Sequence, residues 1–403
     1  MGLNTTPSAN RLHIGIFGKV NSGKSTFINA FTGQDVSIVS DIAGTTTDVV
    51  SKAMEIPQLG PCVMIDTAGF GDGTALGDAR AEKTLQAAGK CDIAIFVIAD
   101  DGITELLFGE EEQSWYKLLI EKKIPVVCIV NSFLNYETAK TRTETLIKYL
   151  KKPPVIIDAK TGYGIEQAKI ELMRSIPEDF ELPYITGNLV EAGDLVMLVM
   201  PQDAQAPKGR LILPQVQTIR ELLDKNCTIV SVVPEQMKHT FEQLKNPPKL
   251  IITDSQVFQM VYECKPKESM LTSFSILFAA YKGDLSYYIK SAKTIERLNE
   301  KAKILIAECC THAPLSEDIG RVKIPNMLRK RFGEGLSVDI VSGADFPNDL
   351  SEYDLIIQCG GCMFNRRYIL GRINKAKEQN VPMTNYGIVI AYLSGILDKI
   401  NLS

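Results

Sequence analysis

Residues 18–25 read Gly-Lys-Val-Asn-Ser-Gly-Lys-Ser and fit the phosphate-binding pattern G-x-x-x-x-G-K-S/T. An apolar run, Leu12–Phe17, precedes this segment, and a stretch with helical spacing, Ser25–Phe31, follows it. In a strand–loop–helix unit of this kind, backbone N–H groups turn toward phosphate oxygens and the helix N-terminus adds partial positive charge. We therefore predict a nucleotide site in which Lys24 reaches the β- and γ-phosphates and Ser25 ligates Mg²⁺.

Two further segments follow in the order expected of a nucleotide switch. Residues 66–69, Asp-Thr-Ala-Gly, come directly after an apolar run, so Asp66 would hold Mg²⁺ through water and the Gly69 N–H would contact the γ-phosphate. Between these sites lies Gly-Thr-Thr-Thr-Asp at residues 44–48, where the Thr46 hydroxyl could reach Mg²⁺. We predict that triphosphate orders this loop and that hydrolysis releases it.

The composition is that of a globular protein with more than one domain. The chain has 403 residues, of which 45% are hydrophobic and 23% charged, and no segment approaches the roughly 18 consecutive apolar residues of a membrane helix. A net charge of -4 and a pI near 5.7 argue against nucleic acid as a main partner. The polar N-terminus lacks the apolar region of a signal peptide, and nine cysteines are too few for a disulfide scaffold. We expect a cytoplasmic protein.

Alternating apolar runs and helical stretches predict three α/β domains. Residues 1–178 have the pattern of βαβ units that form a mostly parallel sheet around the phosphate loop. Residues 184–268 form a small unit that would be marginal alone. Dimerisation through this unit is one interpretation, and simple packing between its neighbours is the other. Residues 269–403 form a third α/β domain that carries the C-terminal cysteines.

The expected elements of the first and third domains can be named by residue. The first domain should contain the strands Leu12–Phe17, Cys62–Ile65, Ile93–Ile98, Pro125–Val130 and Val155–Asp158, and the helices Ser25–Phe31, Asp78–Ala88, Glu110–Glu121 and Thr138–Lys151. The third should contain the strands Lys303–Glu308, Val338–Val341, Leu355–Gln358 and Val381–Met383.

Three cysteines follow two of these strands. Cys310 comes after Lys303–Glu308, and Cys359 and Cys362 enclose two glycines after Leu355–Gln358. Because the carboxyl ends of parallel strands share one edge of a sheet, the three thiolates can converge. Three interpretations stay open, in this order of preference: a 4Fe-4S cluster with one replaceable ligand, a Cys₃His zinc site, and a redox-active dithiol.

Other residues near these cysteines are assigned more simply. Cys309 should face the core, since adjacent strand residues point to opposite sides. His312 is either a fourth ligand or a hydrogen-bond donor to one, and Glu308 is a further candidate. The remaining cysteines are expected to be small buried hydrophobes: Cys62, Cys91, Cys128, Cys227 and Cys264.

The phosphate and switch motifs resemble those of the translation-factor-related GTPases, especially the branch with the tRNA-modification and Era-like GTPases. By position, this resemblance implies nucleotide contacts from Gly18, Asn21, Ser22, Gly23, Lys24, Ser25, Thr26, Thr46, Asp66, Gly69, Asn131, Ala159 and Lys160. It implies roles in hydrolysis for Lys24, Asn21 and Asp66, and Mg²⁺ binding by Ser25 and Thr46. In that branch the residue at the Asn21 position helps bind K⁺, so potassium-stimulated hydrolysis is implied.

The segment of this chain that corresponds to the fourth motif of that family differs from it. Residues 131–134 read Asn-Ser-Phe-Leu where the family has Asn-Lys-x-Asp, so the Asp that accepts from guanine is missing. A hydrogen bond to a charged group contributes about 1.5–3 kcal/mol, so guanine selectivity could fall by about one to two orders of magnitude. Asn135 or Glu137 could substitute. Because Phe70 follows Gly69 where a Gln would orient water, intrinsic hydrolysis should be slow.

The whole chain resembles the maturation GTPases of iron-only (FeFe) hydrogenases. The resemblance rests on the GTPase motifs, on the segments 201–204 and 208–215, and on the Cys-x-His and Cys-Gly-Gly-Cys motifs. It implies a homodimeric GTPase that carries a di-iron precursor to the hydrogenase and works with the radical-SAM maturation enzymes. The 4Fe-4S cluster would be held by Cys310, Cys359 and Cys362, with an open or weakly ligated fourth iron site.

One position differs from many members of that family. Gln358 stands where they have His immediately before Cys-Gly-Gly-Cys, and Gln is a poor iron ligand. Any ligand role of that His would pass here to His312, Glu308 or an exogenous group. Two other hypotheses remain: an RNA-modification or ribosome-assembly GTPase with structural zinc, and a nucleotide-binding adaptor that no longer hydrolyses.

Overall fold

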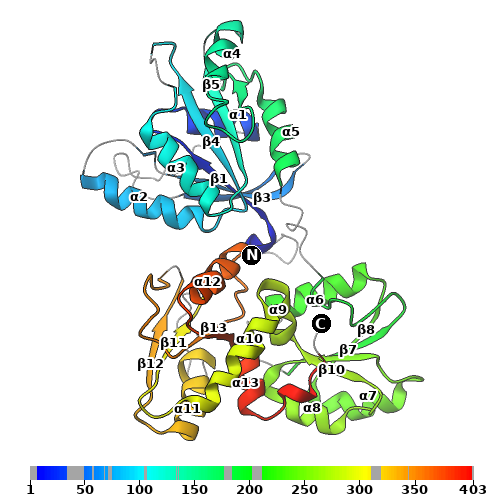
Figure 1. The fold of residues 1–403 in the computed structure, drawn as a ribbon. Helices are drawn as coiled ribbons and strands as arrows, with labels where there is room; N and C mark the ends of the chain where they lie inside the picture. Colours follow the sequence, from blue (N-terminus) through cyan, green and yellow to red (C-terminus); the bar gives the residue numbers. More distant parts are fainter. Residues whose placement is uncertain are drawn as a thin grey trace. The chain divides into compact units, whose positions relative to one another are not determined.

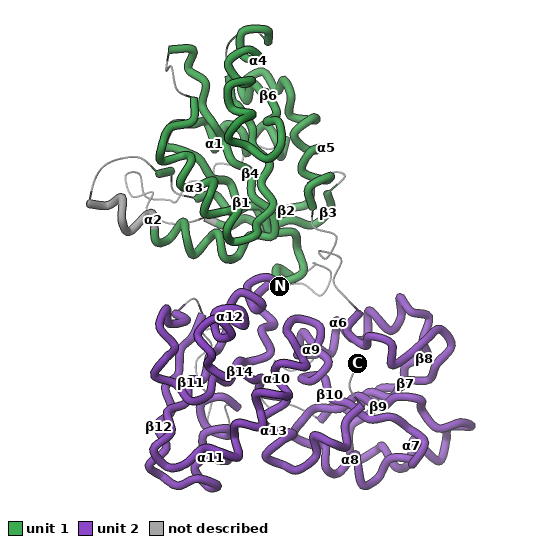
Figure 2. Tube along the Cα trace, in the orientation of Figure 1, with its two compact units in different colours: residues 1–181 green, residues 182–403 purple. Residues whose placement is uncertain are grey.

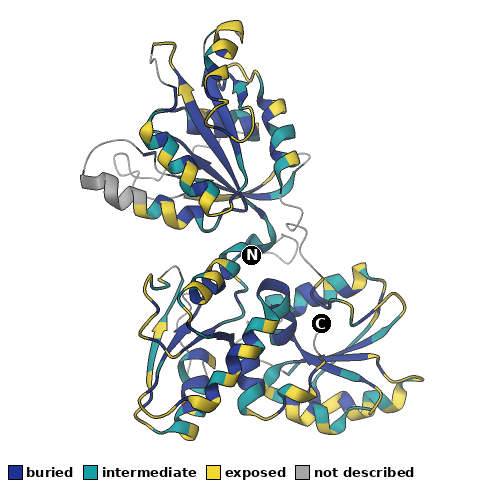
Figure 3. Ribbon diagram, viewed as in Figure 1, coloured by how far each residue is buried: buried dark blue, intermediate teal, exposed yellow. Residues whose placement is uncertain are grey.

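The computed structural model describes residues 7–33, 50–56, 59–67, 69–70, 75–103, 107–132, 134, 136–176, 184–201, 211–309, 319–343 and 345–401. The chain divides into two compact units, Met1–Glu181 and Leu182–Ser403 (Figure 2). In both units the strands are largely buried and the outer helix faces are exposed (Figure 3). Within the described ranges, no helix is long and apolar enough to cross a bilayer.

The first unit is a six-stranded sheet in the order β2-β3-β1-β4-β5-β6 (Figure 1). The strands are β1 Leu12–Phe17, β2 Val50–Ile56, β3 Gly60–Asp66, β4 Ile93–Asp100, β5 Val126–Ser132 and β6 Val155–Ile157. All pairings are parallel except that of β2 with β3. The helices are α1 Lys24–Thr32, α2 Ala75–Ala88, α3 Glu110–Glu121, α4 Tyr136–Glu144 and α5 Ile165–Ser175.

Helices cover both faces of this sheet, which is why its central strands are continuous apolar runs. Ile14 and Ile16 of β1 pack with α1 and α5 in one core. Phe17 and the β4 residue Phe96 pack with α2 and α3 in a second core on the other face. The phosphate loop leaves β1 between these two cores, so a well-packed sheet holds it in place.

The predicted strands and helices of the first unit are confirmed to within a few residues except for one helix, and two elements, β2 and α5, were not predicted. β2 was not expected, because its exposed Ser51, Lys52 and Glu55 interrupt the apolar pattern, as is usual for an edge strand. The helix predicted over Thr138–Lys151 is wrong in its second half, since α4 ends at Glu144 and turns follow. There the Thr145 hydroxyl donates to the Arg142 carbonyl, a local bond that competes with helix formation.

The second unit contains two four-stranded parallel sheets with the same strand pattern, β10-β9-β7-β8 and β12-β11-β13-β14. The strands of the first sheet are β7 Leu195–Val199, β8 Thr228–Val232, β9 Leu250–Thr253 and β10 Met270–Ser273. Those of the second are β11 Lys303–Ala307, β12 Ser337–Val341, β13 Leu355–Gln358 and β14 Met383–Asn385. The helices are α6 Leu213–Asp224, α7 Met237–Gln243, α8 Phe258–Cys264, α9 Phe274–Lys282, α10 Leu285–Ala292, α11 Ile324–Phe332, α12 Arg366–Glu378 and α13 Tyr386–Leu393.

The two sheets share one hydrophobic core. Met197 and Ile251 of the first sheet belong to the same buried cluster as Leu305 and Ile356 of the second. Two expectations need correction here. β10 was not predicted, and β14 begins two residues later than expected, because it is short and buries the polar residues 384–385. The domain boundaries expected near residues 178 and 268 stay predictions.

The strand order of the second sheet determines where a ligand can bind. β11 and β13 are neighbours, and the chain passes from β11 to β12 on one side but from β13 to β14 on the other, so the connections after these two strands run in opposite directions. In open α/β sheets, ligands bind at this kind of switch point. Cys309, after β11, and Cys359, after β13, lie at that edge.

Candidate nucleotide and cysteine sites

The phosphate loop has the backbone shape that phosphate binding requires. Asn21 and Gly23 have φ values of 61° and 87°, in the left-handed region that Asn and Gly tolerate best. Gly23 is the N-cap of α1, so the first N–H groups of the helix lie at the loop. Ser25 and Thr26 are exposed at the start of the helix. The loop predicted from the sequence therefore has the backbone shape of a phosphate-binding loop.

Lys24 is folded back across this loop. Its Nζ atom is buried and donates to the carbonyls of Gly18, across 3.0 Å, and Lys19, across 2.7 Å. Gly69 lies so close that a Cβ atom there would be 2.9 Å from Nζ and 2.7 Å from the Val20 nitrogen. The structure thus places Gly69 beside Lys24 and explains why residue 69 has no side chain, while their predicted contacts with phosphate stay predictions.

Asp66 lies at the end of β3 beside Lys24. Its Oδ1 atom and the Ser22 hydroxyl are buried and have no hydrogen-bond partner among the described residues. Burial raises the pKa of Asp66 to about 6, against the charge of Lys24, and burial lowers the pKa of Lys24 to about 8, against the charge of Asp66. An unsatisfied carboxylate oxygen beside a desolvated ammonium is a donor set that fits Mg²⁺ and phosphate.

Asn131 joins the phosphate loop to the loop after β6. Its Nδ2 atom donates to the Ser22 carbonyl across 3.3 Å, and its Oδ1 atom accepts from the Ala159 N–H across 3.1 Å. The same loop is stiffened by Asp158, which accepts from the Lys160 N–H across 2.9 Å. Asn131 therefore links two loops of the site although the motif around it has changed, and its predicted contact with the nucleotide stays a prediction.

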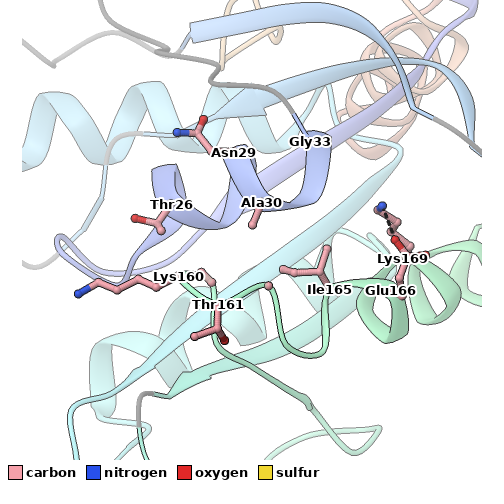
Figure 4. Close-up of a pocket in the computed structure, with 11 residues that line it drawn as sticks. Thr26, Asn29, Ala30, Gly33, Lys160, Thr161, Ile165, Glu166 and Lys169 are labelled. Atoms are coloured by element: carbon pink, nitrogen blue, oxygen red, sulfur yellow. Dashed lines mark hydrogen bonds and ion pairs between the residues drawn. The ribbon is translucent and has the colours of Figure 1, made fainter.

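A pocket of about 770 Å³ lies between α1 and the β6–α5 loop. In Figure 4, Thr26 and Ala30 of α1 lie opposite Lys160 and Thr161 of the loop. Lys169 and Glu166, at its far end, are paired across 2.6 Å. The predicted nucleotide-contacting residues Ala159 and Lys160 line the pocket, whose surface is divided about evenly between polar and apolar atoms.

Ser132, in the altered part of the fourth motif, forms a hydrogen bond with the buried ion pair between Asp100 and Arg142. The Ser132 hydroxyl donates to Asp100 across 3.0 Å, and Arg142 Nε donates to the other carboxylate oxygen across 2.9 Å. Leu134 occupies the position of the missing Asp, and Glu137 is exposed on α4. Asn135, Thr46 and the rest of residues 44–48 lie outside the described residues, so their predicted roles stay predictions.

The cysteine site lies where β11 and β13 end. The Cys309 N–H donates to the Cys359 sulfur across 3.1 Å, and the Cys359 N–H donates to the Ala307 carbonyl across 3.0 Å. Cys362 follows in the same loop, in which Gly361 has a φ of 64°. Cys310 and His312 lie outside the described residues. In the part of the chain that is described, no group of three or more His, Cys, Asp or Glu side chains is arranged to hold a metal ion.

Cys309 has a role that the sequence analysis missed. It is buried in the core, as expected, with 4% of its surface exposed, but its sulfur also contacts Cys359. A hydrogen bond from Cys309, together with N–H groups of Gly361 and Cys309 and the charge of Arg372, lowers the pKa of Cys359 to about 7 despite burial. The same hydrogen bond and burial raise the pKa of Cys309. These contacts favour the thiolate form of Cys359.

Gln358 and Arg372 form a buried polar layer beneath these sulfurs. The Gln358 Nε2 atom donates to Cys309 Sγ across 2.9 Å, and its Oε1 atom accepts from Arg372 across 3.0 Å. The Arg372 guanidinium packs on the rings of Phe346, at 4.8 Å, and Tyr368, at 5.0 Å. With its oxygen already bonded, Gln358 supplies a hydrogen bond to sulfur and no ligand atom to a metal.

Glu308, the other candidate ligand, already has partners. Its Oε2 atom accepts from Arg321 across 3.1 Å and from the Ser342 hydroxyl across 3.3 Å. The Tyr386 hydroxyl donates to Oε1 across 3.4 Å. The carboxylate lies at the correct strand end, but it would have to exchange these hydrogen bonds for a metal.

Lys282 is a second residue that sequence reasoning missed. It ends α9, is 2% exposed, and its Nζ atom donates to the carbonyls of Gly361, across 2.9 Å, and Phe364, across 3.0 Å. Burial lowers its pKa to about 8, while the nearby cysteines act in the opposite direction. Its only sequence signal is that it is the single charged residue of a largely apolar helix, Phe274–Lys282.

Comparison with known proteins first defines the class of the chain. Residues 13–132 match the family model described as 50S ribosome-binding GTPase, so the first unit contains a GTPase domain. The GTPase Der of Wolinella succinogenes is 29% identical over 171 residues, which are 40% of this chain and 35% of that protein. The tRNA modification GTPase MnmE of Endomicrobium trichonymphae is 32% identical over 164 residues, 40% of this chain and 34% of that protein. The chain thus spans about a third of the length of these curated relatives.

Solved structures give a weaker match. Era from Aquifex aeolicus has 20% identity and a TM-score of 0.36, with 55% of this chain and 92% of that chain covered.

The second unit supplies the family. Residues 185–283 match the hydrogen maturase F dimerization domain, and residues 286–401 match the hydrogen maturase F tetramerization domain. With the GTPase domain before them, these matches show that the chain belongs to the hydrogen maturase F family of hydrogenase-maturation GTPases. The third segment, expected to bind a cluster, therefore matches a domain named for tetramerization, and cluster binding by this segment stays a prediction.

Proposed function

We propose that the chain is a cytoplasmic GTPase scaffold of FeFe-hydrogenase maturation that carries a di-iron precursor on a 4Fe-4S cluster. One observation carries the cluster part of this proposal. Cys359, whose pKa is lowered to about 7, lies beside Cys309 and in the same loop as Cys362. This loop is at the switch point of a parallel sheet. Thiolates at such an edge, with backbone N–H groups directed at sulfur, suit an anionic iron–sulfur centre.

The GTPase domain would bind GTP and Mg²⁺ at the phosphate loop. Phosphate oxygens would replace the Gly18 and Lys19 carbonyls as partners of the Lys24 ammonium. Ser25 and Thr46 would ligate Mg²⁺, and Asp66 would hold it through water. Asn21 would bind K⁺ and so stimulate a hydrolysis that is otherwise slow, because Phe70 takes the place of a water-orienting Gln.

The cysteine site would hold the cluster through Cys310, Cys359 and Cys362. The cluster supplies an iron site that can accept an additional ligand, and this would be the attachment point of the di-iron precursor. Glu308 or His312 would fill that position when no precursor is bound. Gln358 and the backbone N–H groups would stabilise the negative charge on the sulfurs.

The nucleotide would act as a switch rather than as a source of metabolic turnover. Slow hydrolysis suits the control of association with partners, which we take to be the FeFe hydrogenase and the radical-SAM maturation enzymes. Domains named for dimerization and tetramerization support a homo-oligomer. The precursor would then bind at the C-terminal cysteines, whereas the hydrolysis that controls its release would take place in the GTPase domain.

The test is reconstitution without oxygen, with iron and sulfide, beside the variants Cys359→Ser and Cys264→Ser. We expect a broad sulfur-to-iron absorption band and an EPR signal on reduction, both lost in Cys359→Ser. Cys264, on α8, is matched as a free cysteine outside the site and should leave both signals unchanged. A colourless protein that holds one zinc ion would refute the scaffold and favour a GTPase with a structural zinc site.

A further inference from the structure

Lys282 is a buried cation whose surroundings offer carbonyls and sulfurs. Its Nζ atom contacts three main-chain oxygens of one loop: Gly361 at 2.9 Å, Phe364 at 3.0 Å and Cys362 at 3.4 Å. An ammonium has three N–H donors, so these three carbonyls can satisfy it completely. Among the described residues, no carboxylate forms an ion pair with it. The titratable groups that lie near it are the cysteines, Cys362 foremost.

These contacts set the orientation of the peptide groups in the loop that contains Cys359 and Cys362. The carbonyls of Gly361, Cys362 and Phe364 all accept from the one Lys282 ammonium, so Lys282 fixes these three peptide groups of the loop. The Gly361 N–H is correspondingly directed at the Cys359 sulfur. Peptide groups oriented in this way present their positive ends to sulfur.

Lys282 also connects two domains. It ends α9, inside residues 185–283 that match the dimerization domain, whereas its partners lie inside residues 286–401. α9 packs against α12 and α13 of the latter segment, so the helix is fixed on both sides. A shift of α9 would therefore move the loop that contains Cys359 and Cys362.

We propose that Lys282 is a positioning residue for the cluster: it holds the Cys359–Cys362 loop in the metal-binding shape and provides a fixed positive charge beside it. This inference rests on the proposed 4Fe-4S cluster. A reduced cluster carries one more negative charge than an oxidised cluster, so a nearby cation stabilises the reduced form more. Removal of that cation should make reduction harder.

The experiment compares Lys282→Met, Lys282→Gln and Lys282→Arg with Lys290→Met. Lys290, on α10, is exposed and serves as the matched control. Each protein is reconstituted without oxygen, and its iron content and EPR-monitored midpoint potential are measured. Partners outside the first metal shell typically change metal affinity by about 10- to 100-fold when removed.

We expect both neutral variants to bind iron more weakly and to have a more negative potential, while Lys282→Arg keeps the wild-type potential. If Lys282→Met does not fold, the polar Lys282→Gln gives the same comparison. Neutral variants with the wild-type potential would overturn the inference, even if their unfolding temperature fell, because the lysine would then be only structural. A wild-type chain that takes up no cluster would instead refute the proposed function on which the inference rests.

Discussion

The Gln358 side-chain nitrogen donates a hydrogen bond to the Cys309 sulfur across 2.9 Å, at the edge where β13 and β11 end. Its oxygen accepts from Arg372, so the orientation of the amide is fixed by both ends. The nitrogen also lies 3.7 Å from the Cys359 sulfur, within reach of a weaker hydrogen bond. A residue that sequence comparison presents as a lost ligand is thus a hydrogen-bond donor to two sulfurs.

Replacement of Gln358 by Leu should preserve cluster assembly but lower the reduction potential, because N–H donors stabilise negative charge on sulfur. It should also reduce the free energy of unfolding by about 1–3 kcal/mol, since Arg372 loses a buried partner. An EPR-monitored redox titration and chemical denaturation measure the two effects. Gln259→Leu, at an exposed position on α8, is the control. Loss of the cluster in Gln358→Leu would mean that Gln358 is needed for assembly itself.

Nucleotide affinity should depend on pH at both ends of the neutral range. Burial raises the pKa of Asp66 to about 6, so affinity for Mg²⁺–nucleotide should fall as the pH drops through that value and the carboxylate is protonated. Burial lowers the pKa of Lys24 to about 8, so affinity should fall again as the ammonium loses its proton above that pH. Fluorescent-nucleotide titrations from pH 5 to 9.5, roughly one unit beyond each pKa, measure this profile.

The variant Lys24→Arg distinguishes the fall in nucleotide affinity at high pH from the fall at low pH. A guanidinium stays protonated throughout the range, so the alkaline fall should disappear even though affinity is weaker overall. An alkaline limb that is unchanged in Lys24→Arg would show that another group titrates there.

Base selectivity should be low for a GTPase, since Leu134 stands where the family has Asp. We expect GTP to be preferred over ITP, which lacks the guanine amino group, by about tenfold or less. Leu134→Asp should raise this preference by about 10- to 100-fold, in competition against a fluorescent nucleotide. Strong discrimination by the wild-type chain, with no gain in the variant, would assign guanine recognition to another residue.

Gly69→Ala should weaken nucleotide binding through crowding alone. The added Cβ atom would lie 2.8 Å from Val20 Cα and 2.9 Å from Lys24 Nζ, so the loop must move. Overpacking of this kind costs about 1–3 kcal/mol, or about 5- to 150-fold in affinity if the cost falls on binding. Gly371→Ala is the control, because that helical position has open space around it. Equal affinities for Gly69→Ala and wild type would contradict the close contact.

Much of the nucleotide site could be predicted from sequence because its determinants are local. The loop at residues 18–25, the strand before it and the helix after it are adjacent in the chain, and Asp66 directly follows a buried strand. The edge strand β2 escaped prediction because only some of its residues are buried, so its pattern is weak.

The contacts around the cysteines could not be predicted, because the residues that form them are far apart in the chain. Lys282 and Gly361 are separated by 79 positions, and Cys309 and Gln358 by 49. No spacing rule links such residues: the pairing of β11 with β13 brings Cys309 beside Gln358, and the packing of α9 against α12 and α13 brings Lys282 to the cysteine loop. Cys309 shows the limit of strand alternation, since a sulfur can be buried in the core and still contact a neighbouring sulfur at a strand end.

The central claim is that the cysteine site delivers a di-iron unit, and hydrogenase activation tests it most directly. The chain would be reconstituted and loaded by the radical-SAM maturation enzymes, purified, and mixed with FeFe hydrogenase that lacks its di-iron subcluster. We predict hydrogen evolution with the wild-type chain and with Cys264→Ser, and none with Cys359→Ser. Equal activation by Cys359→Ser and wild type would contradict the account, because the precursor would then be carried elsewhere.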